Sequence, residues 1–324
     1  MKVLVTGGSG YVGSSAVRDL AAAGHEVVIY DNLSTGHRKL SAGFQLVEGD
    51  IGDKDKLRPL LNGVDAVLHF AASAYVGESI ANPRKYFQNN VEAALALMDA
   101  VLESDVRQFV FSSSCAVYGI PQALPIVESS PKEPVNPYGA TKLFFERVLT
   151  AYASSHGLRS VALRYFNAAG ARLDLNVGEI HSPETHLIPL AIKAALGTAP
   201  PLTVFGNDLP TEDGTCIRDY THIADLASAH LKALDYLARG GESVAVNLGT
   251  GKGTSIGEIL RLVAEFAGRE VPHAFAPPRA GDPPALSAEA RRAKELLGWV
   301  ALHDIRQTIQ DAVHWEKQLP AYLS

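Results

Sequence analysis

A tyrosine and a lysine stand four residues apart in the segment YGATK, residues 138–142. On an α-helix, positions i and i+4 lie on the same face, so the Lys142 ammonium would lie beside the Tyr138 phenol. A neighbouring cation favours the phenolate and would lower the pKa of this phenol from about 10 towards neutrality, where it can act as an acid or a base. Such pairs also arise by chance on exposed helices, so other features of the chain must support the chemistry.

The composition limits the classes of function. The chain has 324 residues and a formal net charge of −6 at pH 7. An acidic balance argues against nucleic acid or an anionic membrane as partner, because both need a basic surface. Cys115 and Cys216 lack the spacing of a metal site or a disulfide framework, so we expect no metal and a reducing compartment. A secretory leader and a bilayer-spanning apolar run are not seen, which predicts a cytoplasmic protein without membrane contact.

Strand-like and helix-like segments alternate around the tyrosine and lysine. Short apolar runs predict strands at 2–8, 26–31, 44–50, 65–71, 107–114, 159–167 and 244–248, and helical spacing predicts helices at 11–24, 84–103, 136–156, 187–197 and 222–239. Apolar strands between helices predict a parallel sheet covered on both faces. After residue 168 the loops become rich in proline and glycine, which predicts a second lobe. We therefore expect one domain at 1–167 plus about 217–249, and a smaller lobe at 168–216 plus about 250–324.

A glycine-rich segment, TGGSGYVG, lies between the first predicted strand and the first predicted helix. Gly7, Gly10 and Gly13 would permit a tight turn and let backbone N–H groups approach a pyrophosphate at the helix N-terminus. Asp31 ends the second predicted strand, where a carboxylate can accept hydrogen bonds from the adenosine ribose and repel a 2′-phosphate. These residues together predict NAD, rather than NADP, as cofactor.

Together with FSSSCAVYG at 111–119, these motifs resemble the extended short-chain dehydrogenase/reductase family. The segments DNLSTGH, RYFNAAGA, HLIP, IRDYTH and NLGTGKG extend the resemblance to the UDP-sugar 4-epimerases of that family, and the motifs run from about residue 2 to residue 299. The resemblance implies an α/β fold with a Rossmann-type, doubly wound parallel sheet. It also implies a smaller, discontinuous C-terminal lobe that binds the substrate.

The activity that the resemblance implies is reversible epimerisation at C4 of a UDP-hexose, from UDP-galactose to UDP-glucose. Tyr138 would remove the proton of the 4-hydroxyl while hydride leaves C4 for tightly bound NAD⁺. Lys142, with the positive nicotinamide, would keep Tyr138 ionised, and Ser114 would hydrogen-bond the 4-oxygen. The 4-ketose would turn over in the pocket and take the hydride back on its other face.

The resemblance further assigns binding residues and a homodimer that pairs the helices near 84–103 and 136–156. For the cofactor these are Gly7, Gly10, Tyr11, Val12, Gly13, Asp31, Asn32, Asp50, Ile51, Phe70, Ala71, Asn89, Tyr138, Lys142 and Tyr165. For the UDP-sugar they are Ser114, Tyr138, Asn167, His186, Leu187, Phe205, Arg218, Tyr220, Arg279 and Asp282. Ala74 stands where some relatives carry a lysine that approaches the cofactor. Leu286 stands where relatives selective for unsubstituted hexoses can have a tyrosine, so the smaller leucine leaves 2-acetamido sugars as possible substrates.

Three alternatives share the fold. A sugar-nucleotide 4,6-dehydratase has an Asp-Glu pair directly after the active-site Ser or Thr, whereas Cys115 and Ala116 follow Ser114 here, which argues against dehydration. A 4-epimerase of UDP-N-acetylglucosamine/galactosamine or of UDP-glucuronate would need the same catalytic residues. A non-catalytic dinucleotide sensor would not need the serine, tyrosine and lysine, all of which are present.

Overall fold

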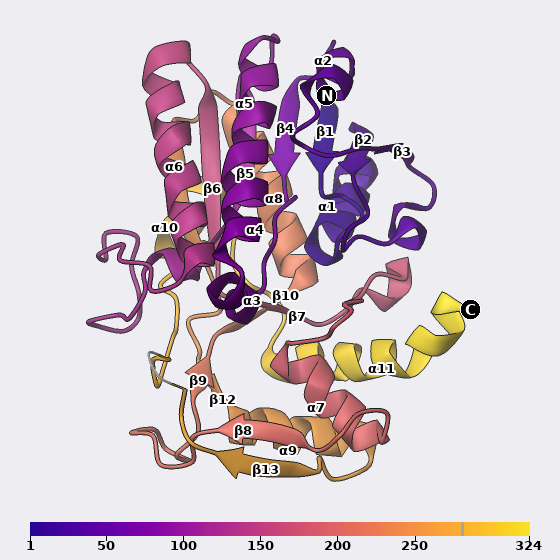
Figure 1. The fold of residues 1–324 in the computed structure, drawn as a ribbon, viewed down its shortest axis with the longest axis vertical. Coiled ribbons are helices and arrows are strands. Elements are labelled where there is room, and N and C mark those ends of the chain that lie inside the picture. The colour runs from indigo at the N-terminus through magenta and orange to yellow at the C-terminus, as the bar shows by residue number, and fades with distance from the viewer. Residues whose placement is uncertain (280–281) are drawn as a thin grey trace.

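Seven strands form the central sheet of the computed structural model, which describes residues 1–279 and 282–324. The strands are β1 (Lys2–Thr6), β2 (Glu26–Asp31), β3 (Gln45–Glu48), β4 (Ala66–His69), β5 (Gln108–Ser114), β6 (Arg159–Tyr165) and β11 (Val244–Leu248). They lie in the order β11-β6-β5-β4-β1-β2-β3, and every neighbouring pair is parallel (Figure 1). The chain builds outward from β1 in one direction and then from β4 in the other, which confirms the predicted Rossmann-type sheet.

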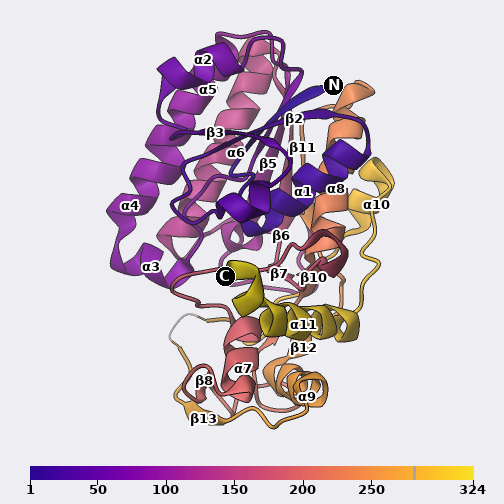
Figure 2. The ribbon, with the colours of Figure 1, turned by 90° about the vertical axis from the view of Figure 1, so that its right-hand side faces the viewer.

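Helices cover both faces of this sheet. One face carries α1 (Tyr11–Ala22), α8 (Ile223–Ala238) and α10 (Arg291–Leu297), and the other carries α2 (Lys54–Leu60), α5 (Ala94–Leu102) and α6 (Pro137–His156) (Figure 2). Within β1, Val3 and Val5 join the core beneath α1 and α8, whereas Leu4 joins the core beneath α5 and α6. Because both faces are buried, the strands read as continuous apolar runs in the sequence.

Helix α6 is defined by signals at both of its ends. The Asn136 side chain accepts a hydrogen bond from the Gly139 N–H at 2.8 Å, and Pro137 occupies the first helical position. The helix ends at Gly157, whose φ of +66° suits glycine. Tyr138 and Lys142 therefore lie in the first two turns of a well-capped helix, close to the carboxyl ends of the strands.

The predicted helix at 84–103 is interrupted in the structure. Two short helices, α3 (Val76–Ala81) and α4 (Pro83–Phe87), are followed by a π-helical turn at Gln88–Ala93 and only then by α5. The turn contains Asn89 and Asn90, whose side chains hydrogen-bond the loop after β4. Apolar periodicity cannot reveal a π-helical turn, which is commonly found at functional sites.

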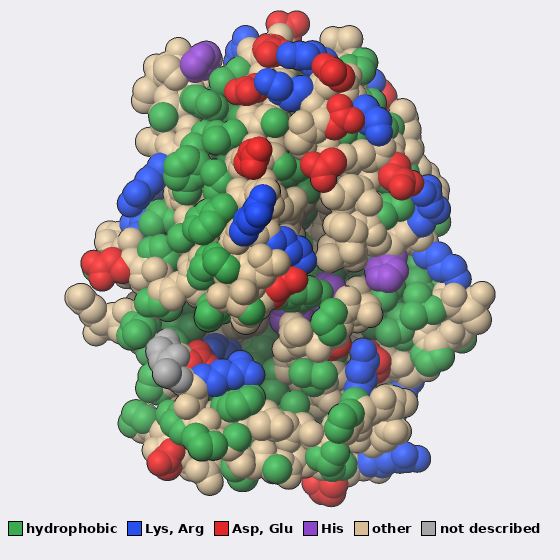
Figure 3. Space-filling model, viewed as in Figure 1, with side chains coloured by type: hydrophobic (Ala, Val, Ile, Leu, Met, Phe, Trp, Pro, Cys, Tyr) green, Lys and Arg blue, Asp and Glu red, His purple; other side chains and the backbone are tan. Residues whose placement is uncertain are grey.

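A second group of elements lies beyond the carboxyl ends of the strands, towards the bottom of Figure 1. It contains α7 (Leu187–Leu196), α9 (Ile256–Ala267) and α11 (Ile305–Leu323), with three small sheets that pair β8 (Leu202–Phe205) with β13 (His273–Ala276), β9 (Ile217–Arg218) with β12 (Thr254–Ser255), and β7 (Asn167–Ala169) with β10 (Tyr220–His222). Ile192, Val204, Ile259 and Val313 belong to its core. The molecular surface is hollowed between this group and the sheet (Figure 3). Among the helices of residues 1–279 and 282–324, none has the length and hydrophobicity that a bilayer crossing needs.

Candidate active site

The glycine-rich turn between β1 and α1 packs so closely against neighbouring backbone that a side chain would not fit at Gly7 or Gly13. Gly7 has a φ of +75°, and a Cβ added to it would lie 2.5 Å from the Ala71 nitrogen. A Cβ on Gly13 would lie 2.2 Å from the Gly7 carbonyl oxygen. Gly10 is the N-cap residue of α1 and has no side chain that could accept hydrogen bonds from the first N–H groups of the helix. The start of α1 therefore presents backbone N–H groups in a form suited to an anion.

Asp31 lies at the carboxyl end of β2 and is 7% exposed. Its carboxylate accepts hydrogen bonds from the N–H groups of Ser9, at 2.9 Å, and Leu33, at 2.8 Å. Burial nevertheless raises the pKa of this carboxyl. The next residue, Asn32, donates to Asp50 at 2.9 Å, which joins the ends of β2 and β3. This edge of the sheet thus offers a rigid carboxylate beside the glycine-rich turn.

Lys142 follows Tyr138 by one turn of α6, as the sequence predicts. The Lys142 ammonium donates to the Ser112 carbonyl oxygen at 2.7 Å and lies 4.9 Å from the centre of the Phe111 ring and 5.7 Å from that of Tyr138. Burial lowers the pKa of Lys142 to about 7, against the opposing effect of the Glu146 carboxylate. The cation is therefore held by a carbonyl and aromatic rings in the protein interior, where its charge is costly.

The pKa of Tyr138 is raised, which contradicts the direction predicted from its spacing with Lys142. Burial is the main cause, and the neighbouring Tyr165 adds to it, while a hydrogen bond with Ser114 acts in the lowering direction. The sequence spacing of Tyr138 and Lys142 indicated that a cation would be near the phenol, but it carried no information on how deeply the phenol is buried. The protein alone therefore keeps Tyr138 protonated at neutral pH.

Ser114 ends β5 next to this tyrosine. Its Oγ accepts a hydrogen bond from the Ala116 N–H at 3.2 Å, which fixes the turn that follows. Burial raises the pKa of the adjacent Cys115 thiol to about 12, and the positive charge of Arg218 opposes this effect. Cys115 is therefore not a nucleophile at neutral pH. Arg218 of β9, in the second group of elements, is therefore near enough to Cys115 to affect its pKa, which places β9 close to the end of β5.

A buried polar network that was not predicted from the sequence holds the middle of α6 against β5 and β6. Arg164 on β6 pairs with Glu146 on α6 through Nε–Oε1 at 2.9 Å and Nη2–Oε2 at 2.5 Å. Ser113 donates to the same carboxylate at 2.6 Å, and Arg164 donates to the Tyr118 hydroxyl at 2.8 Å. Tyr118 in turn donates to Asn247 at 2.7 Å. The sequence signal for this network was Arg164 itself, a charged residue inside the apolar strand segment RSVALRYFN.

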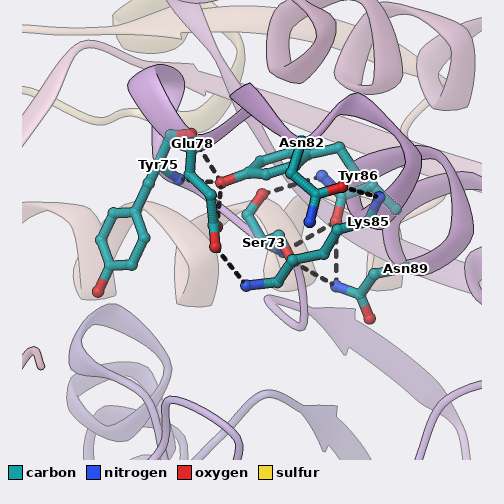
Figure 4. Close-up of polar contacts among 8 residues, drawn as sticks. Ser73, Tyr75, Glu78, Asn82, Lys85, Tyr86 and Asn89 are labelled. Atoms are coloured by element: carbon teal, nitrogen blue, oxygen red, sulfur yellow. Dashed lines mark hydrogen bonds and ion pairs between the residues drawn. The ribbon is translucent and has the colours of Figure 1, made fainter. Parts of the chain in front are cut away.

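A second network lies in the segment from the β4 loop to α4 (Figure 4). The Tyr86 hydroxyl accepts from the Tyr75 N–H at 2.9 Å and lies 2.9 Å from the Glu78 carboxylate, which also binds Lys85 at 2.7 Å. The ring of Tyr86 meets that of Tyr138 edge to face, with 6.4 Å between centroids. Tyr86 is completely buried, so this network fixes the side chain that packs against the Tyr138 ring.

Asn90 connects the same loop to α6. Its side chain accepts from the Ser73 N–H at 2.8 Å and donates to the Ser73 carbonyl at 2.9 Å and to Thr141 Oγ1 at 3.2 Å. Asn89, a predicted cofactor residue, donates to Ser73 Oγ at 3.2 Å. Ala74 follows in this loop and is exposed. The π-helical turn therefore anchors the loop next to Lys142.

Four predicted substrate residues form two pairs in the second group of elements. Arg218 on β9 donates to Asp282 at 2.6 Å. The Arg279 guanidinium lies 4.0 Å from the centre of the Phe205 ring, at the end of β8. Segments far apart in the sequence thus bring two cations and an aromatic ring together, a combination suited to a diphosphate and a flat heterocycle.

The other predicted substrate residues are spread along the boundary between the two groups of elements. Asn167 and Tyr220 lie opposite each other in the β7–β10 pair. His186 is turned towards the carboxylates of Glu179 and Glu184, and Leu187 begins α7. Leu286 packs against a cluster of apolar residues that includes Val117, Leu143 and Phe166, all of which border the catalytic segments.

The match to known proteins decides the family. Residues 3–249 fit the family model described as the NAD dependent epimerase/dehydratase family. The chain belongs to this family. It is 47% identical over 318 residues to the UDP-glucose 4-epimerase of Rhizobium meliloti (strain 1021), covering 98% of this chain and 97% of the relative.

Two solved structures resemble this chain over nearly its full length. The UDP-glucose 4-epimerase from Brucella ovis in complex with NAD is 50% identical, with a TM-score of 0.95 and 97% of this chain and 98% of that chain covered. The UDP-glucose 4-epimerase from Bifidobacterium longum in complex with NAD⁺ and UDP is 34% identical, with a TM-score of 0.93 and 99% of each chain covered. These likenesses confirm the family suggested by the sequence motifs.

The NAD dependence of this epimerase/dehydratase family agrees with the cofactor predicted from the glycine-rich turn and Asp31. The remaining residues assigned to the cofactor surround the same strand ends. Phe70 and Ala71 donate their N–H groups to the Thr6 carbonyl, and the Phe70 ring lies 4.4 Å from that of His230. Tyr165 hydrogen-bonds Ser112, Tyr11 donates to the Gly170 carbonyl, Ile51 is buried and Val12 is half-buried. The glycine-rich turn and the Asp31 carboxylate fit a dinucleotide along this edge.

Proposed function

We propose that this chain is an isomerase, a UDP-glucose 4-epimerase, that interconverts UDP-galactose and UDP-glucose with tightly bound NAD. The observation that carries the proposal is the meeting of Tyr138, Lys142 and Ser114 at the carboxyl end of β5, in a chain of this family. The names of its relatives point in the same direction.

The roles of these residues follow from their environment. Bound NAD⁺ would accept the hydride from C4 of the sugar and return it to the 4-keto group, and its nicotinamide would add a positive charge to the site. Tyr138 takes the 4-hydroxyl proton as a phenolate and gives it back to the 4-oxygen, while Ser114 hydrogen-bonds that oxygen. Lys142 supplies the protein's own positive charge within reach of the phenol. Because burial alone keeps Tyr138 protonated, the phenolate must depend on cations in the site.

The UDP group would bind in the second group of elements. Arg218 and Arg279 would pair with the diphosphate by charge-assisted hydrogen bonds, and Phe205 would lie against the uracil. Asp282 holds Arg218 with a single ion pair, so a diphosphate can replace that partner. Leu286 leaves more room near the sugar than a tyrosine would, which supports acceptance of the 2-acetamido sugars as a second activity.

A homodimer is part of this proposal. Large apolar side chains are exposed beside the catalytic helix, with Phe144 on α6 42% exposed and Phe87 on α4 49% exposed. Hydrophobic side chains also gather over α5 and α6 on the face shown in Figure 3. Pairing this face with a second copy would remove these groups from water. The predicted cytoplasmic location stays a prediction.

A proton NMR time course with UDP-galactose, without added reductant, tests the activity. We expect an equilibrium mixture rich in UDP-glucose. Separate samples with UDP-N-acetylgalactosamine and UDP-glucuronate compare the alternative substrates. The Tyr138→Phe variant should retain NAD but lose conversion, and Tyr152→Phe, on the same helix, should keep it. If UDP-galactose stays unchanged with NAD supplied, the proposed activity is wrong, and conversion of another sugar would identify the substrate instead.

A further inference from the structure

A second group of chemically reactive side chains lies before α7, outside the catalytic residues. Glu179, His181, Glu184 and His186 come from the eight-residue segment EIHSPETH. Each offers one ligand atom, and these atoms all lie within 4.8 Å of one another. The spacing of the two cysteines predicted no metal. Two glutamates and two histidines within eight residues are a different set of candidate ligands.

The distances between the histidine nitrogens and the carboxylate oxygens of this cluster run from hydrogen-bond length to the separation of neighbouring metal ligands. His181 Nδ1 lies 2.9 Å from Glu179 Oε1 and 3.8 Å from Glu184 Oε1. His186 Nδ1 lies 2.5 Å from Glu179 Oε1 and 3.2 Å from Glu184 Oε1. Metal–ligand bonds of about 2.0–2.2 Å place the ligands of a tetrahedral ion about 3.3–3.6 Å apart. The observed distances scatter around this value.

Two of the four ligand atoms are buried and lack a hydrogen-bond partner among the described residues. They are Glu179 Oε1 and His181 Nδ1. Glu179 is only 8% exposed, and its oxygen points at both histidines although the contacts do not have hydrogen-bond geometry. An unpaired carboxylate oxygen and an unpaired ring nitrogen at this depth are costly. A cation between them would satisfy both.

The surrounding structure holds the cluster in place. The Trp315 indole N–H donates to the Glu179 carbonyl at 2.9 Å, and a Cβ on Gly178 would lie 2.3 Å from the Trp315 ring. The Glu184 carboxylate accepts from the backbone N–H groups of Thr185, at 2.7 Å, and His186, at 2.9 Å. These contacts fix the backbone at Glu179 and the position of the Glu184 carboxylate, as supporting hydrogen bonds do in a metal site.

We propose that Glu179, His181, Glu184 and His186 bind one divalent transition-metal ion, with Zn²⁺ as the best match. Two neutral imidazoles and two carboxylates carry a charge of −2, which a divalent cation neutralises. Borderline-soft Zn²⁺ accepts mixed nitrogen and oxygen ligands in tetrahedral geometry. Ca²⁺ and Mg²⁺ prefer sets made entirely of oxygen. His186 is half exposed, so the ion has a path from solvent.

The ion has a structural role that does not depend on the identity of the sugar. Tyr11 of the glycine-rich turn and Tyr75 of the β4 loop both place their rings against His181, with 6.4 Å and 5.5 Å between centroids. Trp315 lies on α11. The site therefore joins the segment before α7 to the nucleotide-binding turn and to the C-terminal helix. Loss of the ion should loosen these three segments together.

Metal binding can be measured on the full-length protein with its NAD. After dialysis against a chelator, Zn²⁺ is titrated in competition with a chromogenic chelator, and metal content is measured by mass spectrometry of the elements. The variants are His181→Asn, which removes a ligand, and His181→Cys, which supplies a thiolate. His314→Asn on α11, an exposed histidine outside the cluster, is the matched control. Circular dichroism and NAD content establish that each variant is folded.

We expect one Zn²⁺ per chain in the parent protein and the His314→Asn control. His181→Asn should bind at least about tenfold more weakly, and His181→Cys should recover affinity. A chelator should lower the Tm of the parent but change that of His181→Asn much less. If the parent binds no Zn²⁺, or if His181→Asn binds it equally well, the proposal is overturned and the cluster is a set of protonated histidine–carboxylate pairs.

Discussion

Glu146 on α6 and Arg164 on β6 form a bidentate ion pair in the interior, with side chains 8% and 4% exposed. Glu146 lies one turn beyond Lys142, so the pair holds the catalytic helix against the sheet. A buried pair is weak evidence for net stability, but removal of one partner leaves an uncompensated charge. The pair thus makes the position of α6 depend on both residues.

Replacing Arg164 alone should therefore be severely destabilising. We expect Arg164→Met to lower the free energy of unfolding by about 3–5 kcal/mol, measured by urea titration. The double variant Arg164→Met/Glu146→Leu should recover much of this loss because it leaves no buried charge. Arg58→Met, which removes a cation paired with Glu103 at the surface, should have little effect. Equal stability of Arg164→Met and the parent would contradict the assigned role.

Lys142 should reduce stability in a pH-dependent way. Its pKa is about 7 in the folded protein, below the usual 10.5. Between these values the unfolded chain binds more protons, so the cost of burying Lys142 grows as pH falls from about 10.5 to 7 and is constant below. NAD-free Lys142→Met should exceed the NAD-free parent in Tm by more at pH 7 than at pH 10, while being inactive. The same substitution at exposed Lys56 is the control, and a pH-independent difference would refute this account.

Asp31 should determine the affinity for NAD and the discrimination against NADP. Asp31→Asn removes the charge and keeps a single acceptor oxygen, so only one of the two N–H groups of Ser9 and Leu33 retains its partner. We expect binding of NAD to the apo-protein to weaken about 10- to 100-fold in calorimetry, since hydrogen bonds to charged groups are stronger. The preference for NAD over NADP should shrink as well. Asp55→Asn, on exposed α2, is the control; an unchanged preference would place the ribose elsewhere.

Leu286 should set tolerance for substituents on the sugar. Leu286→Tyr should reduce conversion of UDP-N-acetylgalactosamine by about tenfold or more relative to UDP-galactose, because the larger ring fills space near the sugar. NMR time courses with each substrate give the ratio. Leu302→Tyr, at a position that is 80% exposed, should leave the ratio unchanged. A parent enzyme without activity on the acetamido sugar would show that another residue closes the pocket.

The dimer proposal depends on the exposed face of α6. Phe144→Glu introduces a charge where two copies would meet, and we expect it to convert a dimer into a monomer in light scattering at micromolar concentration. Leu302→Glu is the matched control. A monomeric parent protein under the same conditions would contradict the dimer proposal.

The sequence predicted the sheet well because its strands are buried on both faces and end at marked residues such as Gly7 and Asp31. It did not predict the π-helical turn at Gln88–Ala93, where Asn90 hydrogen-bonds Ser73 in the loop after β4. It also gave the wrong direction for the pKa of Tyr138, because spacing along a helix carries no information on burial.

The second group of elements was harder to predict. β8 pairs with β13, and β9 with β12, across long stretches of chain, so no local pattern identifies these strands. Glu179 and His186 are only seven positions apart, but their loop has no regular period that would predict that their side chains converge. Sequence reasoning could name Arg218 and Arg279 only through family resemblance, and their roles in binding stay predictions.

The interleaved order of the segments constrains how the chain can be made and divided. The sheet lacks its edge strand until β11 (Val244–Leu248) has been synthesised, and β8 lacks its partner until β13 (His273–Ala276) follows. On the ribosome, β8 and β9 emerge before β13 and β12, the strands with which they pair. Pairings between strands so far apart in the sequence form slowly. Neither the central sheet with its helices nor the second group of elements can therefore be expressed alone as one continuous fragment. A chain that ends before residue 273 would leave β8 without its partner, and unpaired strand edges promote aggregation.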